Sequence, residues 1–88
     1  MEYTIQQLAK LSGTTRRTLR YYGQIGLLTP ARTTPAGYRI YGPAQVDRLQ
    51  QILFYRELGF ELSAIRSILD SPGFQLQAAL QSHLVELE

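Results

Sequence analysis

The chain of 88 residues contains no cysteine, no tryptophan, a single methionine and a single histidine. Without cysteine it can form neither a disulfide framework nor a thiolate metal site, and it offers no cysteine nucleophile. The lone His83 has no companion that would suggest a metal or catalytic centre. Since we also find no carboxylate pair, no Ser/His/Asp set and no phosphate-binding loop, the sequence indicates neither an enzyme nor a cofactor.

Long apolar runs are also missing. No stretch approaches the ~20 apolar residues that a transmembrane helix needs. The N-terminal Met-Glu-Tyr-Thr lacks the basic and then apolar layout of a secretory signal peptide. We therefore expect a cytoplasmic protein that does not associate with a membrane. The length is enough for one domain with a small core.

Acidic residues are absent between Glu2 and Asp47. Residues 3–46 carry six cationic side chains and no acid, a local charge of +6, whereas residues 47–88 carry three arginines against six acids. A solvated surface usually intersperses both signs, and a one-sided positive field attracts polyanions. The asymmetry therefore favours nucleic acid as a partner.

The cationic stretch 15–24, Thr-Arg-Arg-Thr-Leu-Arg-Tyr-Tyr-Gly-Gln, is predicted to form an amphipathic helix. Residues four apart share a helical face, so the arginines and Tyr21 point outward while Leu19 and Tyr22 point inward. The outward residues are Arg16, Arg17, Arg20 and Tyr21. Such a helix suits a nucleic-acid groove, with cations on phosphates and planar groups near base edges. For this stretch taken alone, a solvated charged face is the alternative.

Another helix is predicted just before it. Thr4-Ile5-Gln6-Gln7 has the form of a capping box, and the apolar spacing that follows predicts a helix to about residue 10. Gly13 can adopt the left-handed conformation that ends a helix, and Thr15 can cap the next one. Two helices about four residues apart, over about 4–24, have the helix-turn-helix layout, whose second helix enters the major groove. A plain helical hairpin is the alternative, but it does not explain why the second helix is basic.

Residues 29–42 are predicted to form a β-hairpin. Thr34-Pro35-Ala36-Gly37 places proline where a type I turn needs φ near −65° and glycine where a positive φ is tolerated. The following Tyr38–Tyr41 is rich in aromatic and β-branched residues. Arg32 and Arg39 would project along this hairpin. We interpret it as a wing that grips the DNA backbone beside the basic helix; a plain surface hairpin with tyrosine packed inward is the alternative.

A helix pair is predicted over about 43–70, with Pro43 at its first position and Gly59 between the two helices. The apolar positions are Val46, Leu49, Ile52 and Leu53 in the first helix and Leu62, Ile65, Ile68 and Leu69 in the second. The flanking aromatics Phe54 and Tyr55 are interpreted as packing residues. We expect this pair to provide core and scaffold.

The last segment, 73–88, is rich in leucine. The leucines are Leu76, Leu80, Leu84 and Leu87. The last three follow the four-then-three spacing of a coiled-coil seam, so we expect the start of a dimerisation helix; an ordinary docked helix is the alternative. Because the pattern stops at Glu88 without a helix cap, we expect the chain to be part of a longer protein.

The order helix-turn-helix, wing, helix pair and leucine-spaced helix resembles the MerR family of transcription regulators. The motifs that carry the resemblance are Thr4–Ala9, Arg17–Tyr22, Ile25–Leu28, Gly37–Tyr41 and Leu58–Phe60. Within that family, residues 47–60 look most like the thiostrepton-induced, TipA-type regulators. The sequence departs from the family pattern at Gly23, where an acidic residue is usual.

The resemblance implies a mainly α fold: a winged helix-turn-helix with a small β-hairpin wing and a helix pair in residues 1–72, then the start of a dimerisation helix in 73–88. It implies a homodimer that binds double-stranded promoter DNA at a palindrome, and bends and untwists it to control transcription initiation. RNA polymerase would be affected indirectly, through the promoter. The implied DNA contacts are Arg16, Arg17, Arg20 and Tyr21 in the helix and Tyr38, Arg39 and, more weakly, Arg32 in the wing. Tyr22 is expected in the core, whereas Tyr41 fits either role.

Two other functions remain open. An excisionase-like architectural protein shares the winged layout but bends DNA for recombination; the leucine-spaced helix favours the regulator, because a two-fold symmetric dimer reads a palindrome. A protein–protein adaptor that kept the fold and lost DNA binding would tolerate neutral substitutions at Arg16, Arg17 and Arg39, and its partner would be acidic.

Overall fold

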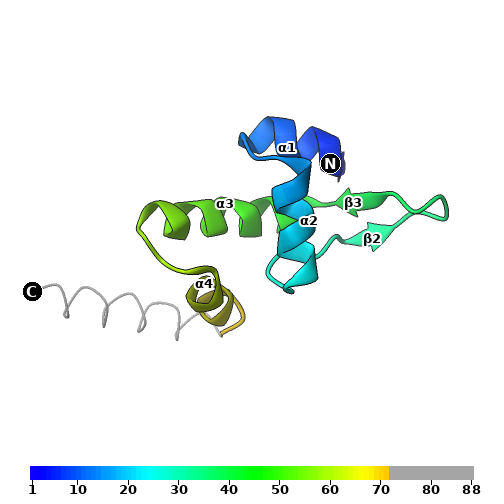
Figure 1. Cartoon of the computed structure of the whole chain (residues 1–88). Coiled ribbons are helices and arrows are strands. Elements are labelled where there is room, and N and C mark those ends of the chain that lie inside the picture. The colour runs from blue at the N-terminus through cyan, green and yellow to red at the C-terminus, as the bar shows by residue number, and fades with distance from the viewer. Residues whose placement is uncertain (72–88) are drawn as a thin grey trace, which may run out of the picture.

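The computed structural model describes residues 1–71. Within them, the chain forms four helices and three short strands (Figure 1). In order they are β1 (Tyr3–Thr4), α1 (Ile5–Ser12), α2 (Arg16–Gln24), β2 (Arg32–Thr33), β3 (Arg39–Tyr41), α3 (Pro43–Glu57) and α4 (Leu62–Leu69). The mainly α class with a small β-hairpin is confirmed.

Helices α1 and α2 begin at the caps that the sequence predicts. Thr4 Oγ1 accepts a hydrogen bond from Gln7 N at 3.2 Å, and Gln7 Oε1 accepts one from Thr4 N at 2.9 Å, which completes the capping box. Gly13, with φ of 72°, ends α1 two residues later than predicted. Thr15 then caps α2 by accepting a hydrogen bond from Thr18 N at 3.0 Å. The turn between the two helices is therefore held at both ends by the caps.

The hairpin forms as predicted, but β1 adds a strand that the sequence did not predict. The sheet is antiparallel in the order β1-β3-β2, with Tyr3 opposite Tyr41 and Thr33 opposite Arg39. A strand of two residues is too short to show an alternating pattern. Its effect is to tie the N-terminus to the base of the hairpin.

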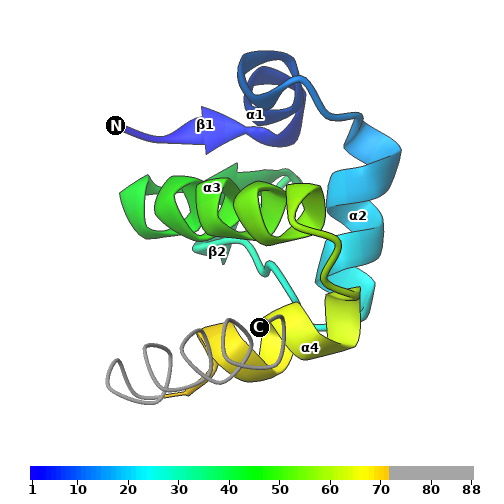
Figure 2. The same cartoon turned by 90° about the vertical axis from the view of Figure 1, so that its left-hand side faces the viewer.

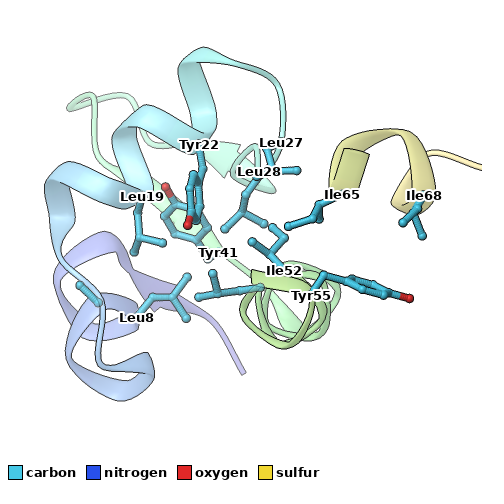
Figure 3. Close-up of a cluster of buried hydrophobic side chains, with 12 residues drawn as sticks. Leu8, Leu19, Tyr22, Leu27, Leu28, Tyr41, Ile52, Tyr55, Ile65 and Ile68 are labelled. Carbon is cyan, nitrogen blue, oxygen red and sulfur yellow. The ribbon is translucent and has the colours of Figure 1, made fainter. Parts of the chain in front are cut away.

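Helix α3 lies at the centre of the fold. Figure 2 shows α1 and α4 on opposite sides of α3, with α2 running across its end from α1 towards α4. Buried side chains from all four helices, β3 and the segment after α2 meet in one core (Figure 3). They are Leu8, Ala9, Leu19, Tyr22, Leu27, Leu28, Tyr41, Leu49, Ile52, Tyr55, Ile65 and Ile68. The scaffold role predicted for α3 and α4 is thus confirmed.

The structure decides the positions of two aromatic residues, Tyr41 and Phe54. Tyr41 is fully buried, which decides between the two roles that the sequence left open for it. Phe54 is 56% exposed, so its interpretation as a packing residue is wrong apart from an edge-on contact with Tyr55 at a ring-centroid distance of 5.5 Å. Tyr55 takes the inward position because it follows Leu49 and Ile52 at helical spacing on α3.

The predicted dimerisation residues Leu76, Leu80, Leu84 and Leu87 lie outside the described residues, as does His83. The coiled-coil interpretation therefore stays a prediction. None of the helices in residues 1–71 combines the length and hydropathy needed to span a membrane.

Candidate nucleic-acid interface

Helix α2 exposes a polar, cationic face and buries an apolar one. Leu19 and Tyr22 enter the core, as predicted, while the residues on the other face are exposed. Tyr21 is 49% exposed. A shallow hollow on this face is lined by Arg17, Thr18, Arg20, Tyr21 and Gln24. The sequence pattern therefore identified the outward residues correctly, although it did not single out Thr18 and Gln24.

The arginines of α2 have no acidic partner in the described part of the chain. No carboxylate of residues 1–71 lies within 4.0 Å of the guanidinium nitrogens of Arg16, Arg17 or Arg20. Three guanidinium groups on one exposed face thus keep their hydrogen-bond donors available. Guanidinium presents a planar fork of donors that matches phosphate and the guanine edge.

The wing extends from the helices beside α2 (Figure 1). Its turn is closed by hydrogen bonds from Gly37 N to Thr34 O at 2.8 Å and from Tyr38 N to Thr34 Oγ1 at 3.0 Å. Gly37 has φ of 89°, a conformation that favours glycine. Tyr38 is 68% exposed at this tip, and Arg39 next to it is half-buried. The wing therefore carries an exposed tyrosine and a cation at successive positions of the chain.

Arg32, the weaker wing candidate, is paired with an acid. Its Nη2 lies 2.8 Å from Glu2 Oε1 and its Nε lies 3.3 Å from Glu2 Oε2, a two-point ion pair on the surface. Hydrogen bonding to Arg32 lowers the pKa of the Glu2 carboxyl. Because β1 and β2 lie on either side of β3, the sheet brings together two residues that are 30 positions apart. Arg32 is therefore engaged by an acid, whereas Arg39 has no ion pair among residues 1–71.

Tyr41 is buried in the core, as Tyr22 is (Figure 3). Burial raises the pKa of its hydroxyl, and the nearby positive charges of Arg39 and Arg20 oppose that rise. Within residues 1–71 its Oη has no hydrogen-bond partner at ordinary distance and geometry, although Arg39 is close enough to favour the ionised form. Arg20 belongs to α2 and Arg39 to the wing, so charges on both elements act on the Tyr41 hydroxyl.

The described residues hold no metal-ligand group: nowhere in 1–71 do three His, Asp or Glu side chains gather. What the geometry provides is an open cationic surface on α2 and the wing. Such a surface suits an extended polyanion rather than a small substrate.

Comparison with known proteins agrees with this geometry. Residues 3–72 match the sequence profile described as MerR HTH family regulatory protein. The chain belongs to the MerR family.

Relatives of the chain are named as transcription regulators. The chain is 51% identical over 82 residues to the HTH-type transcriptional activator mta of Bacillus subtilis (strain 168), a match that covers 93% of this chain and 32% of that protein. It is 49% identical over 81 residues to the HTH-type transcriptional activator TipA of Streptomyces coelicolor, covering 92% and 32%. The chain thus spans about a third of the length of these relatives. They are regulators rather than enzymes, as the sequence predicts for this chain.

Solved MerR structures share the fold. The N-terminal part of the Bacillus subtilis multidrug transporter activator, MtaN, superimposes with a TM-score of 0.86 at 49% identity, covering 97% of this chain and 80% of that one. A structure of EcmrR in complex with DNA superimposes with a TM-score of 0.72 at 31% identity, covering 97% and 34%. The winged helix-turn-helix predicted from the sequence is therefore shown.

Proposed function

We propose that this MerR-family chain is the DNA-binding part of a cytoplasmic transcription regulator that acts as a homodimer on a promoter palindrome. The single observation that carries the proposal is the exposed face of α2, where three arginines lie without an acidic partner among the described residues. A solvated helical face that served only solubility would intersperse acids among its cations. The relative EcmrR has been solved bound to DNA, which supports the same partner.

In this proposal, α2 enters the major groove. The groove admits one α-helix, and an arginine can bind the O6 and N7 of a guanine at two points. Arg16, Arg17, Arg20 and Tyr21 would make the helix contacts. The tip of the wing, with Tyr38 and Arg39, would lie on the backbone beside the groove, and Arg32 would contribute once it leaves Glu2. Phosphate contacts of this kind position the protein, while base contacts specify the sequence.

Dimerisation and DNA distortion complete the proposal. The leucines of residues 73–88 would pair two copies, so that two α2 helices reach two half-sites of a palindrome. Bending and untwisting a promoter has a deformation cost of a few kcal/mol, which contacts to many phosphates would offset. RNA polymerase would then respond to the altered promoter rather than to a surface of this chain.

The test is binding of the chain to random duplex DNA over a salt series, together with its molar mass in solution. Neutralising several phosphates predicts a slope of log affinity against log salt of roughly −4 or steeper. We expect this slope from a dimer. No binding at low salt by a folded dimer would contradict DNA recognition and favour the adaptor function.

Two variants separate base contacts from phosphate contacts. Arg39→Ala should weaken binding to all sequences about equally and reduce the salt slope by about one unit. Arg17→Ala should change the preference between duplexes selected from a random library. Arg56→Ala is the matched control, since Arg56 is exposed at the end of α3 and has no ion pair among residues 1–71. Identical behaviour of Arg17→Ala and Arg39→Ala would contradict this division of roles.

A further inference from the structure

The four residues that follow α2 are held by two arginines from the helix pair α3 and α4. Leu27 and Leu28 are fully buried. The backbone carbonyl of Leu27 accepts a hydrogen bond from Arg48 Nε at 2.6 Å, and that of Ile25 accepts one from Arg66 Nη1 at 2.8 Å. Arg48 lies on α3 and Arg66 on α4, so the end of α2 is fastened to both scaffold helices.

One carboxylate joins these two arginines. Asp70, the residue after α4, accepts a hydrogen bond from Arg48 Nη2 at Oδ1, at 2.8 Å, while its Oδ2 lies 3.6 Å from Arg66 Nε. Arg48 Nη1 also lies 3.5 Å from the Leu69 carbonyl oxygen. Each oxygen of Asp70 thus pairs with one guanidinium, and each guanidinium holds one carbonyl after α2. The Arg48–Asp70 contact is a charge-assisted hydrogen bond, which is stronger than a neutral one. The Arg66–Asp70 contact is an ion pair between half-exposed groups without a hydrogen bond.

The Arg66 side chain packs closely against the backbone at Gly26. A Cβ added to Gly26 would lie 3.2 Å from the Cζ of Arg66, and the φ of Gly26 is +74°. The guanidinium therefore lies flat against the backbone where α2 ends. Figure 2 shows α4 beneath the lower end of α2, which is the junction that these contacts span.

The same cluster borders the candidate DNA-binding surface. Arg66 and Asp70 line a hollow between α2 and α4 together with Tyr21, one of the predicted DNA contacts. Glu2, the other paired acid near the interface, binds Arg32, which donates no hydrogen bond to a backbone carbonyl among residues 1–71. Asp70 thus differs from Glu2, because its paired arginines donate hydrogen bonds to backbone carbonyls after α2.

We propose that Asp70 is a positioning residue for DNA recognition. By fixing Arg48 and Arg66 on the carbonyls of Leu27 and Ile25, it sets the orientation of α2 relative to α3 and α4. That orientation decides whether the side chains of α2 meet base edges at the right depth and register. The DNA part of this inference rests on the proposed function.

The test uses two effects of Asp70→Asn that change DNA affinity in opposite directions. Asp70→Asn removes one negative charge, which by long-range electrostatics alone strengthens binding to any DNA. Loss of positioning instead weakens binding to the duplex that the wild-type chain selects from a random library. Asp47→Asn is the matched control, because Asp47 is an exposed acid on α3 without an ion pair in residues 1–71.

We expect Asp70→Asn to lower the ratio of affinities for the selected duplex and a random duplex of the same length by about five- to 100-fold, the effect of about one lost base contact. Asp47→Asn should leave the ratio unchanged. Asp70→Glu, which keeps the charge, should restore part of the ratio. A folded Asp70→Asn variant with the wild-type ratio would overturn the inference, whereas a wild-type chain that binds no DNA would overturn the proposed function.

A second readout needs no DNA and reports on position directly. In Asp70→Asn the backbone amide NMR signals of residues 25–28 and of the end of α2 should shift, while Asp47→Asn leaves them in place. Arg66→Gln, which removes one arm of the cluster, should shift the same signals if Asp70→Asn does not fold. Unshifted signals in folded Asp70→Asn would contradict the positioning role.

Discussion

The ion pair between Glu2 and Arg32 predicts that one substitution increases DNA affinity. Glu2→Gln should make the chain bind DNA more tightly. In the wild-type chain both oxygens of Glu2 face the guanidinium of Arg32, at 2.8 and 3.3 Å. Both side chains are about half exposed, at 50% and 55%. Exposed ion pairs contribute little to folding, so the substitution should leave the fold intact while it frees Arg32 for a phosphate.

The magnitude follows from counterion release. One further phosphate contact steepens the slope of log affinity against log salt by about 0.9. Extrapolated from about 1 M to about 0.1 M salt, that slope corresponds to an affinity gain of about eightfold. Because the contact is to the backbone, the gain should be the same for every sequence. Conversely, Arg32→Ala in the wild-type background should change the slope less than Arg39→Ala does.

The assay is fluorescence anisotropy of a labelled random duplex titrated with protein at several salt concentrations. Glu57→Gln is the matched control, since Glu57 is an exposed acid on α3 without an ion pair among residues 1–71. It makes the same chemical change and the same change in net charge. A slope and affinity for Glu2→Gln equal to those of Glu57→Gln would refute the reasoning, because the gain would then reflect net charge rather than a released Arg32.

Three further substitutions have defined outcomes. Gly23→Ala should raise the free energy of unfolding by about 0.5–1 kcal/mol in urea, because an added Cβ meets only the Leu28 carbonyl oxygen at an ordinary 3.6 Å. A lower free energy of unfolding would show strain in α2. Tyr41→Phe should lie within about 1 kcal/mol of wild type, because the buried hydroxyl has no hydrogen bond in residues 1–71; a loss of more than about 2 kcal/mol would indicate one. Arg32→Ala should raise the pKa of the Glu2 carboxyl in an NMR titration, since hydrogen bonding to Arg32 lowers it in the wild-type chain. Because the pKa of Glu2 is lowered in the folded state, the pair stabilises the fold at pH values above the unfolded pKa of that carboxyl. This contribution disappears as the pH falls through the lowered pKa. An unchanged pKa in Arg32→Ala would mean that the pair does not persist in solution.

Much of the fold could be predicted because local signals agree with one another. The caps at Thr4 and Thr15, the turn ending at Gly37 and the proline at the start of α3 each act within four residues of chain. The outward face of α2 followed from helical periodicity alone. Those signals placed the helices and the wing, and with them the cationic surface.

What could not be predicted depends on partners that are distant in sequence. Glu2 meets Arg32 only because β1 joins the hairpin as a third strand. Asp70 reaches Arg48 only once α4 packs against α3, whereas its pair with Arg66 is a local one, four residues apart. Charge counting treated each of these residues as a free charge, although their interactions decide which cations remain available to DNA.

The most direct test of the account is an NMR titration of the chain with duplex DNA that follows the backbone amides and the arginine side-chain Nε–H groups. We predict that the signals of α2 and of the wing shift as duplex is added, with Arg17, Arg20 and Arg39 among the most affected. The exposed Arg56 on α3 should stay in place. Shifts centred on α3, or a cationic face of α2 that does not respond to DNA, would contradict the proposal that this helix and its wing form the DNA-binding surface.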